Sequence, residues 1–222
     1  MAEDLLLLVT DDASGRLLVP AAQVDAGLGG ANLAELTLLN KVDLSGEGDA
    51  GRAGRIVVRD PSPAGDQVLD AALETLIARQ GSKPSTVIGP LSKNLRRRLY
   101  ERLAASGVVR AGQGRILGIF PAHTWPAQDA HHEAQVRLLL TQALVQQQVP
   151  DARSAALIAL LHALRCEHKI VDPRRNELSR QQLRARAEEI ASGNWAPQAD
   201  SKTIGEITAA GRAAVEAAAS AG

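Results

Sequence analysis

Short apolar runs near the start of the chain predict β-strands separated by a turn. The run LLLLV at 5–9 is typical of a buried strand, DDASG at 11–15 of a turn, and RLLVP at 16–20 of a second strand that Pro20 ends. We therefore expect the chain to open with a β-hairpin. A further apolar run, RIVV at 55–58, predicts another strand.

Helical spacing of apolar residues appears next along the chain. It predicts helices over 33–42, 67–80 and 87–107, and Gly107 is a typical residue for the end of the last one. The glycine-rich stretch GLGGAN at 27–32 precedes the first of these helices. Such a stretch either presents free N–H groups to a phosphate, or forms a tight turn or a close contact between helices.

The remaining pattern consists of one more hairpin and then only helices. VVRAGQGRILGIF at 108–120 predicts a strand, a glycine-rich turn and a strand. Helical periodicity follows over 131–148, 151–170, 179–191 and 203–219. We therefore expect a mainly α-helical fold with short β-hairpins, in a single domain over 1–222, with a helical bundle in the C-terminal half.

Two segments of the N-terminal half resemble each other. The stretches 33–42 and 99–108 share a leucine, a glutamate and a valine at a constant offset, and a predicted strand follows each of them. Each unit combines a helix with two strands, as the second half of a winged helix does. This winged-helix-like pattern makes DNA binding an alternative function, although it is also a compact way to pack a helix on a hairpin.

The charge of the chain is balanced overall but uneven locally. The sequence has 25 Lys+Arg and 25 Asp+Glu, which argues against a protein coated in nucleic acid. The predicted helix 87–107 nevertheless holds a basic cluster with one acid, Glu101. The cluster consists of Lys93, Arg96, Arg97, Arg98 and Arg102.

The two faces of this helix differ in chemistry. At 100° per residue, Leu91, Leu95, Leu99 and Leu103 form one apolar stripe. On the opposite face lie Lys93, Arg96 and Arg97. Because few acids lie one helical turn away, these cations suit an anionic partner such as a phosphate group.

The second predicted hairpin is apolar near its end, where Ile116, Leu117, Ile119 and Phe120 occur. Some of these side chains are expected in the core. A basic helix beside an apolar hairpin is also what a peripheral membrane protein needs. Each cation near an anionic surface contributes about 1 kcal/mol, and inserted apolar surface adds roughly 25 cal/mol per Å².

Composition places the protein in a compartment. The chain has 222 residues and one cysteine, Cys166, so no internal disulfide can form, which is typical of a reducing compartment. The acidic start MAEDLLLLV lacks the basic region of a secretory signal, and no apolar run approaches the roughly 20 residues of a membrane span. We expect a cytoplasmic protein, and the arginine and alanine bias indicates a GC-rich bacterial genome.

Catalytic motifs do not stand out in the sequence. It has no G-x-S-x-G, P-loop or G-x-G-x-x-G motif. His162 and Cys166, one helical turn apart, would supply two metal ligands, but zinc takes three or four, so we prefer a pair that packs between helices. Asp66 and Asp70 lie at a predicted helix start, where acids favour the helix dipole. We therefore expect no catalysis, no cofactor and no metal.

Four stretches of the chain carry motifs that occur together in one known family. RDPSPAGDQVLDAAL at 59–73 contains an S-P-x-G-D-x-x-L-D segment, and GLGGANLAEL at 27–36 is similar to a G-L-R-G-G…E-L stretch. Both motifs resemble those of the Golgi phosphoprotein 3 family. KNLRRRL at 93–99 resembles its basic helix, which the same glycine and apolar hairpin follow. DARSAALIALLHAL at 151–164 is similar to a later helical segment, so the resemblance covers nearly the whole chain.

The resemblance implies a mainly α-helical fold that binds the headgroup of phosphatidylinositol 4-phosphate. In eukaryotic members it also implies recruitment to Golgi membranes, an adaptor role for the cytoplasmic tails of glycosyltransferases, and a hairpin used for membrane insertion or self-association. The family's pocket has two basic residues on its helix, here Lys93 and Arg96. Its tryptophan position holds Pro20 and its arginine position holds Gly29, and Arg97 and Arg16 are candidates to compensate.

These observations lead to one expected function and two alternatives. We expect a non-catalytic peripheral membrane protein on the inner face of the membrane that binds anionic, phosphoinositide-like phospholipid. Its site would comprise Lys93, Arg96 and Arg97 and the apolar hairpin, with self-association and a protein tail as further partners. The alternatives are a winged-helix-like DNA-binding protein that uses the same helix, and an adaptor whose basic face binds an acidic peptide.

Overall fold

The computed structural model describes residues 1–46, 48–49, 52–116, 120–193 and 205. The elements along the chain are α1 (Ala2–Leu8), α2 (Ala21–Leu38), β1 (Val42–Leu44), β2 (Ile56–Val58), α3 (Gln67–Ile77), α4 (Pro84–Ser92), α5 (Leu95–Ala105), β3 (Gly112–Ile116), β4 (Phe120–Thr124), α6 (His131–Leu144), α7 (Ala152–Ala163), α8 (Glu167–Ile170), the 3₁₀ turn η1 (Arg174–Asn176) and α9 (Arg180–Ala191). The predicted mainly α-helical fold with short hairpins is confirmed. The predicted helix over 203–219 lies outside the described residues apart from Gly205.

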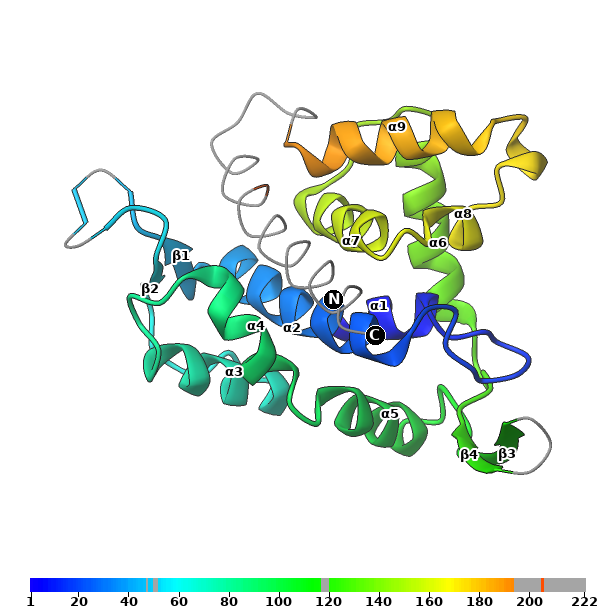
Figure 1. Cartoon of the computed structure of the whole chain (residues 1–222), viewed down its shortest axis with the longest axis horizontal. Coiled ribbons are helices and arrows are strands. Elements are labelled where there is room, and N and C mark those ends of the chain that lie inside the picture. The colour runs from blue at the N-terminus through cyan, green and yellow to red at the C-terminus, as the bar shows by residue number, and fades with distance from the viewer. Residues whose placement is uncertain (47, 50–51, 117–119, 194–204, 206–222) are drawn as a thin grey trace.

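Helix α2 runs through the middle of the molecule (Figure 1). It packs against α7 on one side and against α3, α4 and α5 on the other, and α9 covers α7 (Figure 1). Helix α1 contacts α2, α5, α6 and α7, so it joins the two halves of the chain. Buried apolar residues from α1 to α9 form one continuous cluster. A single domain requires such a continuous core, and the domain count itself stays a prediction.

The predicted opening hairpin is wrong, because residues 2–8 form helix α1. Leu5, Leu6 and Leu8 are fully buried, since neighbouring helices surround α1. An apolar run this short shows no period, so a strand and a helix buried on all sides look alike. The predicted turn is confirmed, and Thr10 and Leu17 form an isolated antiparallel bridge around it.

The glycine-rich stretch lies inside α2 rather than in a loop before it. An added Cβ at Gly29 would lie 2.6 Å from the carbonyl oxygen of Ile88 on α4. Among the alternatives for this stretch, close contact between helices is therefore confirmed, and the turn and the phosphate loop are wrong. Tight packing here overrides the low helix propensity of glycine.

The predicted helix over 87–107 is two helices, α4 and α5, separated at Lys93 and Asn94. Asn94 adopts the left-handed conformation, with φ of 57°. The predicted apolar stripe is confirmed, because all four of its leucines are buried. Gly107 ends α5 as predicted, and the N–H of Val108 donates to the carbonyl of Leu103 at 2.9 Å.

Both helix–hairpin units exist. In the first, β1 follows α2 and pairs with β2, with Val42 opposite Val58, so the predicted helix over 33–42 ends earlier, at Leu38. In the second, β3 and β4 follow α5 with Ile116 opposite Phe120. The predicted glycine-rich turn of this hairpin is wrong, because 112–114 belong to strand β3. The connection at 117–119 lies outside the described residues.

Candidate functional site

A pocket of about 800 Å³ opens where the first turns of α2 and α5 meet the end of β4. Four segments line it: residues 15–19 of the loop before α2, Ala21 and Asp25 of α2, the region from Ser92 to Tyr100, and residues 123–125. The pocket therefore depends on the break between α4 and α5. This break starts a new helix at Leu95 and places the basic residues of its first turn beside α2.

An aromatic pair forms one wall of the pocket. The rings of Tyr100 and Trp125 stack with their centroids 4.8 Å apart and their planes 4° from parallel. The hydroxyl groups of Tyr100 and Thr10 hydrogen-bond at 2.7 Å, and burial raises the pKa of Tyr100. The backbone N–H of Trp125 donates to the backbone carbonyl of Gly15 at 3.0 Å. A Cβ at Gly15 would lie 2.2 Å from that nitrogen, so only glycine permits this contact.

The charges on the pocket wall are partly paired. The guanidinium of Arg96 donates to both carboxylate oxygens of Asp25, at 2.8 and 3.4 Å. Arg97 pairs with Glu101 one turn further along α5, at 3.1 Å, and this pair is exposed. The sequence suggested unpaired cations because it shows only neighbours on the same helix. The acid that pairs with Arg96 comes from α2.

Other cations of the basic cluster have different environments. Arg102 donates to Glu3 and to Asp66, both at 2.6 Å, so it ties α5 to α1 and to the start of α3. Asp66 also caps α3, as predicted, by accepting from the N–H groups of Val68 and Leu69. Within the described part of the chain, the exposed Lys93 and Arg98 have no ion-pair partner.

The predicted headgroup-binding residues do not all lie at this pocket. Arg96 and Arg97 line it, and Lys93 lies between the lining residues Ser92 and Asn94. Pro20 lies between the lining residues Val19 and Ala21 and caps α2. Gly29 is not part of the lining and faces Ile88 of α4 instead. Arg16, the other candidate to compensate, is part of the lining.

Most of the lining was missed from the sequence, including the residues that give the pocket its acid and its aromatic wall: Asp25, Tyr100 and Trp125. No local motif marks them, because the fold brings them together from distant segments. Aromatic residues make up only 2% of the chain, and two of them stack in this pocket. That rarity is the one signal in the sequence that would have pointed to them.

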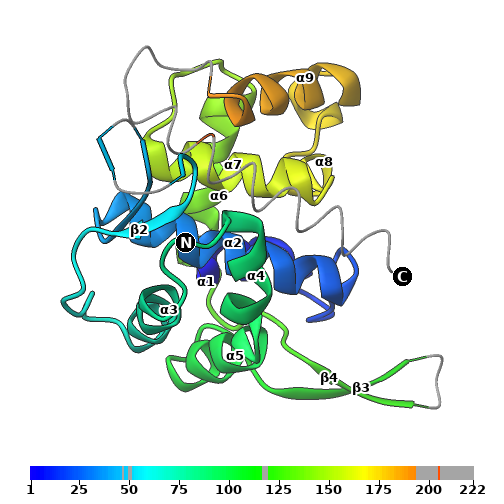
Figure 2. The same cartoon turned by 60° about the vertical axis from the view of Figure 1, so that its left-hand side comes forward.

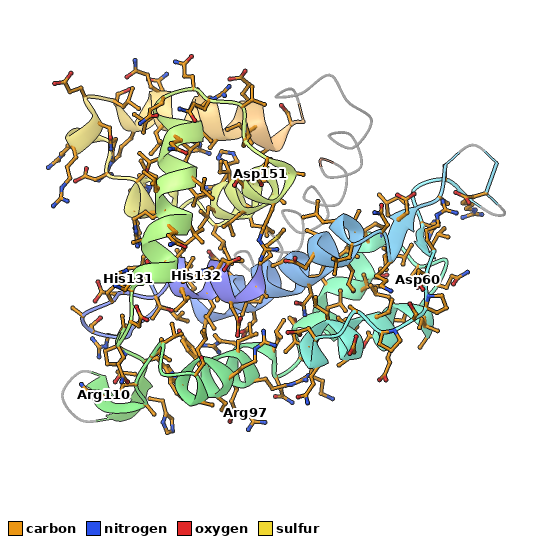
Figure 3. All side chains as sticks on the ribbon, turned by 180° about the vertical axis from the view of Figure 1, so that it is seen from behind. Asp60, Arg97, Arg110, His131, His132 and Asp151 are labelled. Atoms are coloured by element: carbon orange, nitrogen blue, oxygen red, sulfur yellow. The ribbon has the colours of Figure 1, made fainter. Side chains whose placement is uncertain are left out.

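The base of the second hairpin, β3–β4, lies at the edge of the pocket. His123 and Thr124 of β4 line the pocket, and the hairpin projects from the body beside α5 (Figure 2). Ile116 and Phe120 are its last described pair, and Leu117 and Ile119 lie outside the described residues. Figure 3 shows Arg97 and Arg110 on the hairpin side of the molecule. Cations and the hairpin therefore share one side.

The proposed pair of His162 and Cys166 takes part in helix packing. His162 Nε2 lies 2.6 Å from Glu188 Oε2 on α9, and Nδ1 lies 3.7 Å from Glu167 Oε1 on α8. The Cys166 thiol donates to the carbonyl of Leu161, and burial raises its pKa to about 12. Within the ranges that the structure describes, no group of three or more potential ligands is arranged to hold a metal.

A comparison with family models decides the relationship. The model of Golgi phosphoprotein 3 (GPP34) matches residues 1–207. The chain belongs to the Golgi phosphoprotein 3 family. A search of curated proteins finds no match. Membership of the Golgi phosphoprotein 3 family fits a non-catalytic role that involves contact with lipid or protein. In the described part of the chain, no helix is long and apolar enough to cross a membrane.

Proposed function

We propose that this member of the Golgi phosphoprotein 3 family is a non-catalytic peripheral membrane protein. It binds anionic phospholipid headgroups, phosphatidylinositol 4-phosphate-like ones included, in the pocket between α2, α5 and β4. Lys93, Arg96 and Arg97 supply the positive charge, and the β3–β4 hairpin contacts the bilayer. The protein works on the inner face of a bacterial membrane and acts there as an adaptor.

One observation carries this proposal: a pocket lined by arginines opens at the base of a projecting hairpin. A guanidinium binds phosphate in a bidentate geometry, which is also the geometry in which Arg96 binds the carboxylate of Asp25. Family membership supports the same role independently. The pocket and the hairpin lie on one side, so both would face a single membrane surface.

The exposed charges at and around the pocket support the same orientation. Lys93, Arg97, Arg98 and Arg110 are exposed around α5 and the base of the hairpin. Each cation near an anionic membrane contributes about 1 kcal/mol. The four cations together therefore contribute more to membrane binding than a single exposed ion pair contributes to stability, which is about 0–1 kcal/mol. The headgroup in the pocket then adds specificity to this attraction.

Co-sedimentation with vesicles tests the proposal. The vesicles are neutral, or contain phosphatidylinositol, its 4-phosphate, or a generic anionic lipid at matched surface charge. We expect binding to all anionic vesicles, tightest to those with the 4-phosphate, and a decrease with added salt. If the protein binds none of the anionic vesicles, the proposal is wrong, and the basic cluster serves a protein or DNA partner instead.

A further inference from the structure

The pocket contains a negative charge that anion binding alone does not explain. Asp25 of α2 is one of the lining residues. Its carboxylate accepts two hydrogen bonds from Arg96, which lies 71 positions later in the sequence. A carboxylate in this place lowers the affinity for any purely anionic ligand, because the ligand has to displace it. The pair is therefore either a structural bridge between α2 and α5, or part of what the pocket recognises.

A structural bridge explains Asp25 poorly. The side chains of Arg96 and Asp25 are 32% and 35% exposed, and ion pairs this exposed add little to stability. Asp25 lies past the first turn of α2, so it does not cap the helix. The two helices already contact each other, and both contribute buried leucines to the core. The core therefore does not depend on the pair.

The charges of the lining indicate which ligand fits. Three arginines, Arg16, Arg96 and Arg97, line the pocket together with one aspartate, Asp25, and the acid that pairs with Arg97, Glu101, is not among the lining residues. A ligand with two negative groups and one positive group matches this pattern. Its ammonium group would replace Arg96 as the partner of Asp25, so the carboxylate would keep a cationic partner when Arg96 turns to the ligand.

The aromatic wall supports the same type of ligand. Trp125 is half-buried and Tyr100 is buried, and both of the stacked rings belong to the lining. Aromatic faces attract ammonium groups through their quadrupole. Asp25 and Trp125 belong to the same lining, so the pocket offers a cation both a carboxylate and an aromatic ring.

We propose that the pocket takes an aminophospholipid headgroup, which carries an ammonium group beside its phosphate, and that phosphoserine fits its charges best. The phosphate and carboxylate of phosphoserine would contact the arginines, and its ammonium group would contact Asp25. This inference rests on the proposed function and adds a preference among headgroups of equal net charge. It makes Asp25 a residue that determines specificity.

Vesicles of equal charge test this inference. Phosphatidylserine or phosphatidylglycerol is mixed at the same mole fraction into phosphatidylcholine, whose choline has no N–H to donate to Asp25. We expect the wild-type protein to bind phosphatidylserine vesicles about three- to fivefold more tightly. In Asp25→Asn the preference should disappear, because phosphatidylglycerol binding rises while the contact with the ammonium group is lost.

Asp60→Asn is the matched control, since it removes one negative charge, as Asp25→Asn does, at a site far from Arg97 (Figure 3). It should leave the ratio between the two lipids unchanged. Asp25→Ser serves as a second variant, and far-UV circular dichroism checks the folding of each. Equal wild-type binding to both lipids, tighter binding to phosphatidylglycerol, or a preference that survives in both Asp25 variants would overturn the inference. Absence of binding to either vesicle would instead overturn the proposed function.

Discussion

At the residue scale, Gly29 shows how the fold constrains a position that the family resemblance assigns to phosphate binding. Its Cα faces the carbonyl of Ile88, so α2 and α4 approach each other closely at this point. A long side chain here would have to displace α4. At Gly29, where the family has an arginine, this chain instead packs α2 closely against α4. Its pocket is lined by other arginines, including Arg16 and Arg97.

We predict that Gly29→Ala destabilises the protein although alanine favours helices. The added methyl group would lie 2.6 Å from a backbone oxygen, and such overpacking costs about 1–3 kcal/mol. Gly27→Ala is the control on the same helix, because its methyl group would meet only side-chain ends of Leu5 and Leu164, at 3.4 Å. Urea denaturation should show a lower free energy of unfolding for the first variant alone. Equal effects of the two substitutions would contradict the packing argument.

The sequence predicted part of this site at the residue scale. Periodicity placed Arg96 and Arg97 on the polar face of their helix, and the structure places them at the pocket. Periodicity does not report contacts between distant segments, so the partner of Arg96 remained unknown. The same limit hid the stacking of Tyr100 on Trp125.

At the element scale, the errors occurred where tertiary packing outweighs local preference. Helix α1 is buried on all sides, so its leucines show no amphipathic period. The continuous leucine stripe from 91 to 103 suggested one helix, because both α4 and α5 bury leucines against the same core. Asn94, which lies between them in the left-handed conformation, was the cue in the sequence, since asparagine tolerates that conformation better than most residues.

His162 illustrates an interaction between elements that depends on pH. It extends from α7 toward Glu167 on α8 and Glu188 on α9. The Glu167 carboxylate, and then that of Glu188, raise the pKa of His162 above its ordinary value, although burial opposes the shift. The charged imidazolium therefore stabilises the folded state below the unfolded pKa of about 6.5. This contribution is lost as pH rises through the higher folded pKa.

We predict that His162→Asn destabilises the protein more at about pH 6 than at about pH 9. The difference should amount to about 1.4 kcal/mol for each unit by which folding raises the pKa of His162. Urea denaturation of both proteins at the two pH values measures it. Glu188→Gln should reduce the same difference, because it removes one carboxylate partner. An equal destabilisation at both pH values would refute the role of the imidazolium.

At the scale of the whole molecule, one core connects the described helices. Apolar residues of α1 contact helices from both halves of the chain, and the cluster continues to Ile190 in α9. The helical class was predictable from the sequence because long amphipathic segments dominate it. The way α1 joins the halves was not, since it depends on contacts between segments far apart.

We propose that the chain is a single domain and predict one cooperative unfolding transition in urea. Far-UV circular dichroism reports the helices, and the fluorescence of Trp125 in a Trp195→Phe background reports the pocket. The two midpoints should coincide, because the pocket wall is built on helices of the common core. Two separate transitions, or midpoints that differ, would indicate independent units.

The measurement that tests the central claim most directly is a vesicle titration of two matched double variants. Lys93→Ala/Arg96→Ala removes two charges at the pocket. Arg180→Ala/Arg184→Ala removes two exposed charges on α9, on the other side of α2 from α5 (Figure 1). We predict that the first variant binds phosphatidylinositol 4-phosphate vesicles about tenfold or more weakly, and that the second binds nearly like wild type. Equal binding by both variants would contradict the claim that the α2–α5 pocket is the membrane-binding site.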